Sequence, residues 1–150
     1  MMERTLVIVK PDGVQRALVG EIIKRFEARG LRIAGMKLMR IPRETAERHY
    51  AEHKGKSFYE STVAYITSAP VVVMCLEGPD AVAAVRATMG ATNPLSAPPG
   101  SIRGDLGLSI ARNLVHGADK PETAVRELAL YFTADELISY ERSGDKWLTE

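Results

Sequence analysis

Two short runs of almost wholly apolar residues set the strongest limits on how this 150-residue chain can fold. Residues Thr5–Val9 and Val71–Leu76 carry no charge and are rich in β-branched side chains, which is typical of strands covered on both faces. Apolar residues at helical spacing follow each run. A chain that alternates buried strands with amphipathic helices forms layers of sheet and helix, and this length suffices for one domain with a sizeable core.

Turn, capping and periodicity signals predict the other elements. Turn residues at Lys10–Gly13 end the first strand, and a helix should follow from Val14 to Gly30. A phase shift across Gly35 indicates a bulge in the second strand. The remaining expected elements are that strand over Leu31–Ile41, helices over Arg43–His53 and Phe58–Ile66 (with a capping box at Ser57–Glu60), a helix from Gly78 and Pro79 to Gly90, an irregular loop over Ala91–Gly104, a short strand over Leu114–His116, a helix from Pro121 to about Tyr131, and a capped helix from Thr133.

This order predicts an α+β fold of the ferredoxin-like βαββαβ type. It implies a sandwich built on a four-stranded antiparallel sheet, with a helical pair inserted between strands two and three and with C-terminal helices. Residues 1–150 should form a single domain, because the sequence has no internal repeat, low-complexity tract or linker. The tail to Glu150, which contains Trp147, should cover either another subunit or the chain's own core.

Composition excludes several classes of protein. A formal net charge of +1 argues against a polybasic nucleic-acid or membrane binder, so any attraction for phosphate must come from locally placed Lys and Arg. The single cysteine, Cys75, cannot form an internal disulfide and suits a reducing compartment. No apolar window reaches transmembrane length, and no signal-peptide pattern follows Met1. A cytoplasmic location is therefore expected.

The segment Ile102–Asp119 is the first candidate for chemistry. Its glycines and arginines lead into a short apolar run that presents His116. Imidazole is a competent nucleophile near neutral pH, and guanidinium groups favour phosphate chemistry. A solvent-facing loop with a chance histidine is the alternative. Arg103 lies between glycine-containing turns, where its long side chain could swing over a ligand.

Other candidate residues have plain structural explanations beside the functional ones. Lys10 should emerge at the end of a strand, as an anion ligand or an ordinary turn lysine, and Arg86 near a helix end is also favoured there by the helix dipole. His49 and His53 are spaced i, i+4, which is half a metal site, but no third ligand follows at a suitable spacing, so a protein-bound metal is not expected. Tyr50 and Phe58 could stack on a flat ligand or belong to the core. Glu127 falls at the edge of an apolar helix face and needs a partner, for which an imidazole is suitable.

The chain resembles the nucleoside diphosphate kinase family along essentially its whole length. Four segments match the family's successive signatures in order: Val9–Val14, Gly90–Pro94, Ser101–Asp105 and Asn113–Gly117. The resemblance implies a ping-pong reaction in which a nucleoside triphosphate phosphorylates His116, Glu127 holds the imidazole, and a diphosphate then receives the phosphoryl group. It also implies Mg²⁺ carried on the nucleotide phosphates and a homo-oligomer, with a hexamer favoured over a tetramer and with the loop Ala91–Asp105 helping at a subunit contact. The residues it assigns to phosphates and the ribose 3′-hydroxyl are Lys10, Tyr50, His53, Arg86, Thr92, Arg103 and Asn113, and those around the base are Phe58, Thr62 and Ile110.

The sequence departs from the family pattern after the histidine. Ala118 stands where the family usually has a serine, and Lys120 where it usually has a small residue. That serine normally helps to hold the catalytic carboxylate, so its loss should slow turnover roughly tenfold, if one hydrogen bond is lost in the transition state.

Two other classes of function remain open at this stage. One is a nucleotide-binding regulatory module of the same fold that never becomes phosphorylated. The other is an RNA-binding module, because βαββαβ sheets often bind single strands. The near-neutral charge and the lack of aromatic residues in Thr5–Val9 and Val71–Leu76 count against RNA binding. Holding the base by stacking, with few hydrogen bonds to its edge, predicts tolerance of purines and pyrimidines alike.

Overall fold

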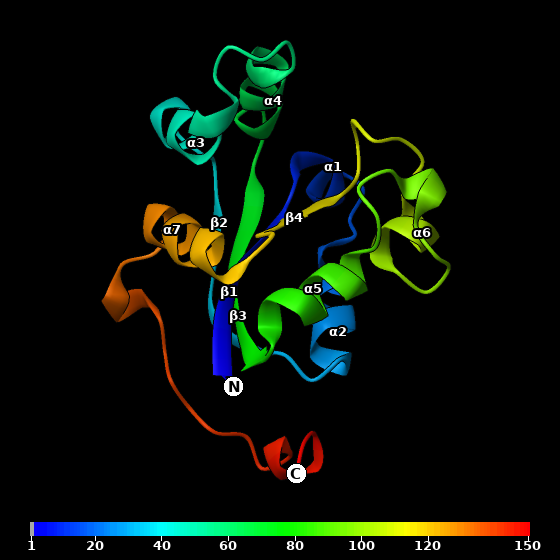
Figure 1. Cartoon of the computed structure of the whole chain (residues 1–150), viewed down its shortest axis with the longest axis vertical. Helices are drawn as coiled ribbons and strands as arrows, with labels where there is room; N and C mark the ends of the chain where they lie inside the picture. Colours follow the sequence, from blue (N-terminus) through cyan, green and yellow to red (C-terminus); the bar gives the residue numbers. More distant parts are fainter. Residues whose placement is uncertain (1) are drawn as a thin grey trace.

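A four-stranded antiparallel sheet lies at the centre of the computed structural model, which describes residues 2–150. Its order is β2-β3-β1-β4, so the first strand of the chain is an inner strand (Figure 1). The register shifts between Ile33 and Gly35, which confirms the predicted bulge. The strands are β1 (Met2–Val9), β2 (Arg32–Met39), β3 (Val71–Pro79) and β4 (Val115–Gly117).

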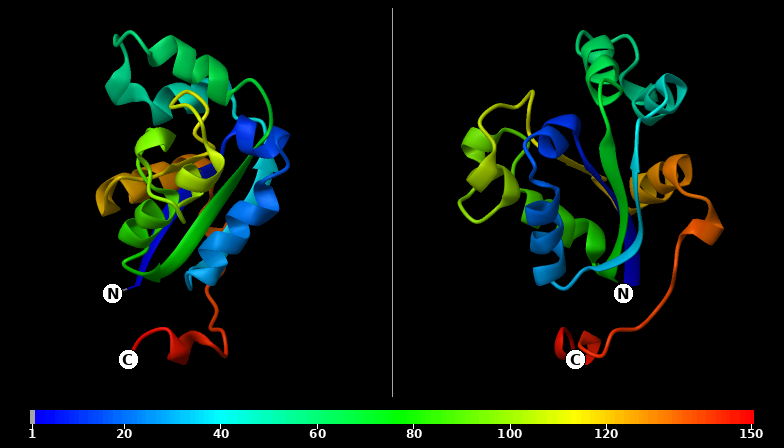
Figure 2. Two further views of the ribbon diagram at one scale, coloured as in Figure 1. Left: turned by 90° about the vertical axis from the view of Figure 1, so that its right-hand side faces the viewer. Right: turned by 180° about the vertical axis from the view of Figure 1, so that it is seen from behind.

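Helices cover both faces of this sheet. Figure 2 shows α7 on one side and α2 with α5 on the other, while α3 and α4 lie beyond one end of the strands. The helical pair between β2 and β3 is the predicted insertion. The helices are α1 (Pro11–Gln15), α2 (Val19–Ala28), α3 (Arg43–His49), α4 (Tyr59–Ile66), α5 (Ala81–Met89), α6 (Ile102–Leu106) and α7 (Pro121–Tyr131), with 3-10 turns at Ala51–His53, Pro94–Ser96, Ala134–Glu136 and Asp145–Trp147.

The alternation of side chains in β1 divides the core into two layers. Leu6 and Ile8 pack with residues of α4 and α7, whereas Val7 and Val9 pack with residues of α2 and α5. All four side chains are fully buried. This confirms the expectation that an uninterrupted apolar run marks a strand covered on both faces. The covered faces also leave no open central strands on which single-stranded RNA could stack.

The helix predicted from Val14 to Gly30 is instead two helices, α1 and α2, and the first begins within the predicted turn. Proline at the first helical position starts the short helix α1, because its fixed φ suits that place. Gly13 is required there, since a Cβ would lie 2.7 Å from Val9 Cγ1. The chain then breaks at Ala17, which has a φ of 59°, before α2 begins. Gly30, with a φ of 106°, follows α2 as predicted.

Several other element boundaries differ from the predicted ones, because tertiary pairing and packing outweighed the local sequence signals. The helix predicted over Arg43–His53 divides at Tyr50, and Ser57 does not cap α4, whose N-cap residue is Phe58. Pro79 belongs to β3, since β1 pairs with β3 up to that residue, and α5 starts at Ala81. The end of the predicted irregular loop forms the first residues of α6, which is capped by the Ser101 side chain, and the predicted last helix is only a 3-10 turn.

The C-terminal tail hydrogen-bonds to β2 and then ends beyond the start of β1 (Figure 1). Trp147 is 81% exposed, so it does not cover the core of its own chain. Arg142 holds the tail by donating to the carbonyl oxygens of Gly30 and Leu31 at 2.8 and 3.2 Å. Within residues 2–150, no helix is both long enough and apolar enough to cross a membrane.

Candidate active site

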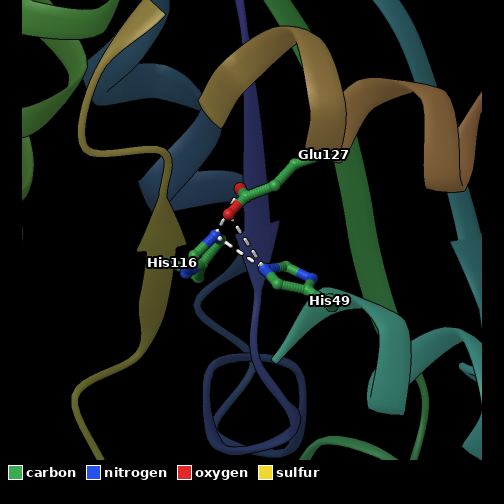
Figure 3. Close-up of side chains that lie close together, drawn as sticks. All are labelled: His49, His116 and Glu127. Atoms are coloured by element: carbon green, nitrogen blue, oxygen red, sulfur yellow. Dashed lines mark hydrogen bonds and ion pairs between the residues drawn. The ribbon is translucent and has the colours of Figure 1, made fainter. Parts of the chain in front are cut away.

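Three side chains from separate elements meet beside β1 (Figure 3). His116 lies on β4, Glu127 on α7 and His49 at the end of α3. Glu127 Oε1 lies 2.8 Å from His116 Nε2, and Glu127 Oε2 lies 3.3 Å from His49 Nε2. The two Nε2 atoms are 3.2 Å apart. The carboxylate therefore has one imidazole at each of its oxygens.

Local backbone geometry places His116 at the site. Leu114 has a φ of 74°, a left-handed conformation that is costly for a leucine, and its backbone is held on both sides. Its carbonyl oxygen accepts from Lys10 N at 2.9 Å, and its N–H donates to Asp12 Oδ2 at 3.0 Å. His116 then pairs with Ile8 and is the half-buried residue of β4, with buried Val115 and Gly117 on either side of it along the strand. The strained turn thus delivers one imidazole to the end of a rigid strand.

Glu127 lies on the face of α7 that packs on the sheet. Ala124, Leu128 and Tyr131 are its buried neighbours, at the spacing of one helical face. Glu127 is only 4% exposed, more buried than the edge position that the sequence predicted. A carboxylate this deep needs donors, and both imidazoles lie within reach.

Tyr131 completes the cluster behind His49. Its hydroxyl lies 2.7 Å from His49 Nδ1, and both side chains are buried. If the hydroxyl donates to Nδ1, the neutral imidazole carries its proton on Nε2 and donates toward Glu127. The ring of Tyr50 stacks on that of His49, with centroids 4.5 Å apart and planes 16° apart. When the hydroxyl donates in this way, His49 is fixed in both tautomer and orientation.

Burial keeps His116 neutral, whereas hydrogen bonds keep Glu127 ionised. Burial lowers the pKa of His116 to about 4, despite the opposing hydrogen bond to Glu127, so the imidazole is neutral at pH 7. Burial also works against ionisation of Glu127, but the hydrogen bonds from His116 and His49 outweigh it and lower the pKa of this carboxyl below its ordinary value. A neutral imidazole has one N–H, and an ionised carboxylate can only accept, so the His116 proton lies on Nε2. Nδ1 then holds the free lone pair.

This cluster forms one wall of a pocket of about 240 Å³. Lys10, Arg86 and Arg103 also line the pocket, so three cationic side chains share it with His116. The His116 side chain keeps 20% of its surface exposed. His116 is therefore neither sealed from solvent nor separated from these cations. The other predicted residues that line the pocket are Tyr50, His53, Thr92, Asn113 and Glu127.

Lys10 and Asn113 are joined inside the pocket. Lys10 Nζ donates to Asn113 Oδ1 at 2.8 Å, and Asn113 Nδ2 donates to the Thr92 carbonyl oxygen at 3.0 Å. Burial, helped by the charge of Arg103, lowers the pKa of Lys10 to about 8. The ammonium thus remains charged at pH 7 but is poorly solvated, which strengthens its attraction for an anion.

Arg103 is fixed, contrary to the expectation that it could swing over a ligand. It is 5% exposed and donates to the carbonyl oxygens of Asn113, Gly90 and Val115 at 3.1, 3.1 and 2.6 Å. Burial and the neighbouring Arg86 lower its pKa to about 10, so it stays cationic at neutral pH. The neighbouring glycines suggested a mobile Arg103 side chain, but hydrogen bonds to three carbonyl groups hold it in one position.

Three predicted residues lie outside the pocket lining. Phe58 and Ile110 are 47% and 58% exposed, and Thr62 is half-buried on α4. Phe58 remains close to the pocket, because its ring centroid is 5.3 Å from that of His53. These residues could therefore hold the part of a ligand that extends beyond the cationic pocket.

Sequence reasoning missed two parts of the site. His49 was paired with His53, whereas the helix break at Tyr50 separates them and turns His49 toward His116 and Glu127. Its buried neighbours Thr45 and Ala46 share its helix face, and that spacing could have indicated a buried imidazole. Asp12 was also overlooked, although its side chain holds the strained Leu114 turn. Tyr65 Oη donates to Asp12 Oδ1 at 2.7 Å and so supports that turn from α4.

Ala118 lies in a small apolar cluster with Val82 and Ala124 and is 1% exposed. It leaves Glu127 without the hydroxyl donor expected from a serine. Both carboxylate oxygens nevertheless have an imidazole nitrogen within 3.3 Å. The carboxylate is therefore not left without donors by this substitution.

The chain matches known proteins over nearly its whole length. The family model described as nucleoside diphosphate kinase matches residues 3–137. The nucleoside diphosphate kinase of Thermomicrobium roseum is 60% identical over 147 residues, covering 98% of this chain and 99% of the relative. That of Pelotomaculum thermopropionicum is 60% identical over 149 residues, covering 99% of this chain and all of the relative.

Solved structures give the same result for the fold. The structure of a halophilic nucleoside diphosphate kinase from Halobacterium salinarum in complex with CDP superposes with a TM-score of 0.97 at 49% identity, over 100% of both chains. A nucleoside diphosphate kinase family protein from Babesia bovis has a TM-score of 0.95 at 43% identity, over 98% of this chain and 99% of its own. With a family model over most of its length and relatives of this identity over nearly all of it, the chain belongs to the nucleoside diphosphate kinase family.

Proposed function

We propose that this phosphotransferase works by a ping-pong reaction in which His116 carries the phosphoryl group. In the first half, the γ-phosphorus of a nucleoside triphosphate is attacked by His116 Nδ1, the bond to the β,γ-bridging oxygen breaks, and the diphosphate leaves with that electron pair. In the second half, the terminal oxygen of another nucleoside diphosphate attacks the same phosphorus and releases the imidazole. One pocket thus serves the donor and the acceptor in turn.

The observation that supports this most directly is the engagement of His116 Nε2 by Glu127 at 2.8 Å. Because Nε2 is occupied, the lone pair of the neutral imidazole lies on Nδ1, which has no hydrogen-bond partner within residues 2–150. When Nδ1 bonds to phosphorus, positive charge develops on the ring. The ionised Glu127 lies where it stabilises that charge, so its role is positioning and electrostatic.

The cationic side chains of the pocket would stabilise the negative charge of the transferred phosphoryl group. Phosphoryl transfer passes through a loose transition state with charge spread over three equatorial oxygens. Lys10, Arg86 and Arg103 line the pocket beside His116, and Arg103 is held rigidly by three carbonyl groups. Charges fixed before the reaction need no reorganisation during it, so they lower the barrier more than mobile ones.

The nucleoside should lie toward the outer end of the pocket. Tyr50, His53, Thr92 and Asn113 would contact the phosphates and the ribose 3′-hydroxyl, and Phe58 with Ile110 and Thr62 would enclose the base. Exposed apolar side chains such as Phe58 and Ile110 offer surfaces for stacking rather than hydrogen bonds to a base edge. We therefore expect broad tolerance of purines and pyrimidines.

Magnesium fits this scheme as an ion carried on the nucleotide phosphates. The one cluster of three His, Cys, Asp or Glu ligands within residues 2–150 contains two imidazoles, whereas Mg²⁺ prefers six oxygen ligands. When bound, the ion would neutralise phosphate charge. The residues proposed for catalysis are thus His116, Glu127 and Lys10, with no protein-built magnesium cage among them.

The test is to mix the protein with γ-labelled ATP and isolate the phosphoenzyme. We expect an acid-labile label on wild type and none on His116→Ala. His53→Gln, which changes another histidine of the same pocket, should still be labelled. Spectroscopic identification of the phosphohistidine should give the Nδ1 isomer. Label that persists in His116→Ala, or that lies on Nε2, would contradict the proposal.

Transfer of that label to a non-adenine diphosphate separates this function from the regulatory-module alternative. A module that only binds nucleotides would give no label and no transfer. The paired His116 and Glu127 and the high identity to named kinases both favour the enzyme. We expect both steps to proceed, in a cytoplasmic enzyme whose residues 1–150 form one domain.

Assembly into a homohexamer, rather than a tetramer, is also part of the proposal. Leu95 is 77% exposed in the loop that was expected at a subunit contact, and Trp147 is 81% exposed in the tail that was expected to cover another subunit or its own core. Burial of these two side chains against another subunit would remove apolar surface from water. Sedimentation equilibrium should give the mass of a hexamer, and a monomer would contradict the expectation.

A further inference from the structure

The cluster of His49, His116 and Glu127 has a second chemical property. Its three donor atoms, two imidazole Nε2 atoms and one carboxylate oxygen, lie within 4.8 Å of one another. The separations are 3.2 Å between the nitrogens, and 2.8 and 3.3 Å between each nitrogen and its nearer carboxylate oxygen. Four-coordinate zinc has bonds of about 2.0–2.1 Å, so its ligand atoms stand about 3.3 Å apart. The two nitrogens are therefore spaced as two ligands of one zinc ion, and the carboxylate, with one oxygen beside each of them, supplies the third donor.

The chemistry of the donors selects the class of ion. Two imidazoles and a carboxylate match sites that bind Zn²⁺ and other borderline divalent ions with a fourth position open. The His116 side chain is 20% exposed to the pocket, so a fourth ligand such as water can reach the centre. Tyr131 Oη, 2.7 Å from His49 Nδ1, supplies the outer hydrogen bond that orients such ligands.

We propose that His49, His116 and Glu127 form a binding site for Zn²⁺ or a similar divalent ion in the nucleotide-free protein, and that its occupation blocks phosphorylation of His116. Mg²⁺ would not bind there, because it prefers oxygen ligands in octahedral geometry. The inhibitory part rests on the function proposed above, whereas the binding part does not.

Blocking follows from the position of one proton. In the metal-free cluster the His116 proton lies on Nε2 and the lone pair on Nδ1. A cation on Nε2 needs the lone pair there, so the proton must move to Nδ1, and Nδ1 can no longer attack phosphorus. His49 changes in the same way: its proton moves from Nε2 to Nδ1 and is then donated to the Tyr131 hydroxyl oxygen. The rearrangement conserves protons and needs only a rotation of that hydroxyl.

The contact between the two Nε2 atoms favours this exchange when both carry a proton. If both imidazoles donate to Glu127, their Nε2 atoms meet at 3.2 Å as two donors, and no hydrogen bond can form between them. A cation replaces that unfavourable contact with two coordinate bonds. Its charge is also balanced by a carboxylate that is already ionised.

The first experiment measures binding without activity. Nucleotide-free protein is titrated with Co²⁺, whose visible absorption reports tetrahedral coordination, and the bound Co²⁺ is then displaced by Zn²⁺. We expect one ion per chain. His49→Gln, which keeps an N–H donor for Glu127 but removes the imidazole ligand, should weaken Zn²⁺ binding by at least about 100-fold, and Tyr131→Phe by about 10–100-fold.

His53→Gln is the matched control, because His53 lines the same pocket outside the cluster. It should bind Zn²⁺ within twofold of wild type. Circular dichroism confirms that each variant is folded, and Glu127→Gln provides a further ligand variant if His49→Gln is not. Weak, non-saturating binding, or equal binding by wild type and His49→Gln, would overturn the site.

The second experiment measures phosphoenzyme formation from γ-labelled ATP with and without Zn²⁺. Stoichiometric Zn²⁺ should prevent labelling, a chelator should restore it, and Mg²⁺ at the same concentration should not inhibit. Labelling that proceeds at full rate with zinc bound would refute the inhibition. Tetrahedral Co²⁺ binding in a protein that is never labelled would instead refute the proposed function and leave the metal site standing.

Discussion

Removing the hydroxyl of Tyr131 tests whether the cluster behind His116 is held as its geometry indicates. In Tyr131→Phe, the buried His49 Nδ1 loses its partner at 2.7 Å. Leaving a buried acceptor unpaired costs about 1–3 kcal/mol in the free energy of unfolding. For a chain of this size, about 2 kcal/mol corresponds to a fall in Tm of about 4–8 °C.

The effect on transfer should be smaller than the effect on stability. Without Tyr131 the tautomer of His49 is no longer fixed, and the His49 form with a bare Nε2 would face Glu127 Oε2 at 3.3 Å without a proton to donate. A hydrogen bond of this length contributes about 1 kcal/mol to holding the carboxylate, so phosphorylation of His116 should slow about fivefold. His116 keeps its own bond to Glu127, and the reaction therefore survives.

The control is Tyr59→Phe. Tyr59 is also buried in the same core layer, but its hydroxyl makes no hydrogen bond within residues 2–150. This variant should change the free energy of unfolding by less than about 0.5 kcal/mol. Thermal unfolding and rapid-quench labelling with ATP would be measured on both variants. If they unfold at the same temperature and are labelled at the same rate, Tyr131 does not orient His49.

Three further predictions concern charge and the family's missing serine. Lys10 has a pKa of about 8, so it loses its proton as pH rises through that value, and kcat/KM should fall above about pH 8; Lys10→Arg should move that fall to higher pH. His116 has a pKa of about 4 and is protonated only below it, so the rate of phosphorylation should hold down to about pH 5 and fall as pH approaches 4; a fall centred near pH 6.5 would refute the burial argument. Ala118→Ser should raise kcat by at most about tenfold, because Glu127 Oε2 already has His49 as a donor; no gain would show that the serine is dispensable here.

The order and type of the main elements could be predicted because they depend on burial patterns. Thr5–Val9 and Val71–Leu76 are apolar at every position or nearly so, and both became inner strands covered on two faces. Helix α7 was predicted from Pro121 to Tyr131 and has those limits. Errors arose where tertiary pairing or backbone strain decided the boundary. Pro79 continues β3 because β1 pairs with it, and Leu114 adopts a positive φ that no sequence signal indicates.

The candidate site was predicted in composition but not in its arrangement. His116 lies in one of the four matching motifs, Glu127 was singled out at the edge of an apolar helix face, and the structure places the two side chains 2.8 Å apart. His49 could not be placed by spacing along its own helix, because its partners come from β4 and α7. The rigidity of Arg103 likewise depends on carbonyl groups from Gly90, Asn113 and Val115, which only the folded backbone brings together.

His49 links the two proposed properties of the cluster, which are holding the Glu127 carboxylate and binding a cation. Glu127 is buried at 4% exposure, and a carboxylate at that depth is held only by nearby donors. Imidazole is a good donor for this purpose, but unlike a serine hydroxyl it can also release its proton to the other ring nitrogen and bind a cation. A cluster that positions its carboxylate with His49 therefore becomes a potential zinc site for the same reason that it can retain Glu127 next to Ala118. If zinc binds there, the affinity for zinc and the orientation of Glu127 should both weaken in Tyr131→Phe, because one hydroxyl fixes the ring that serves both.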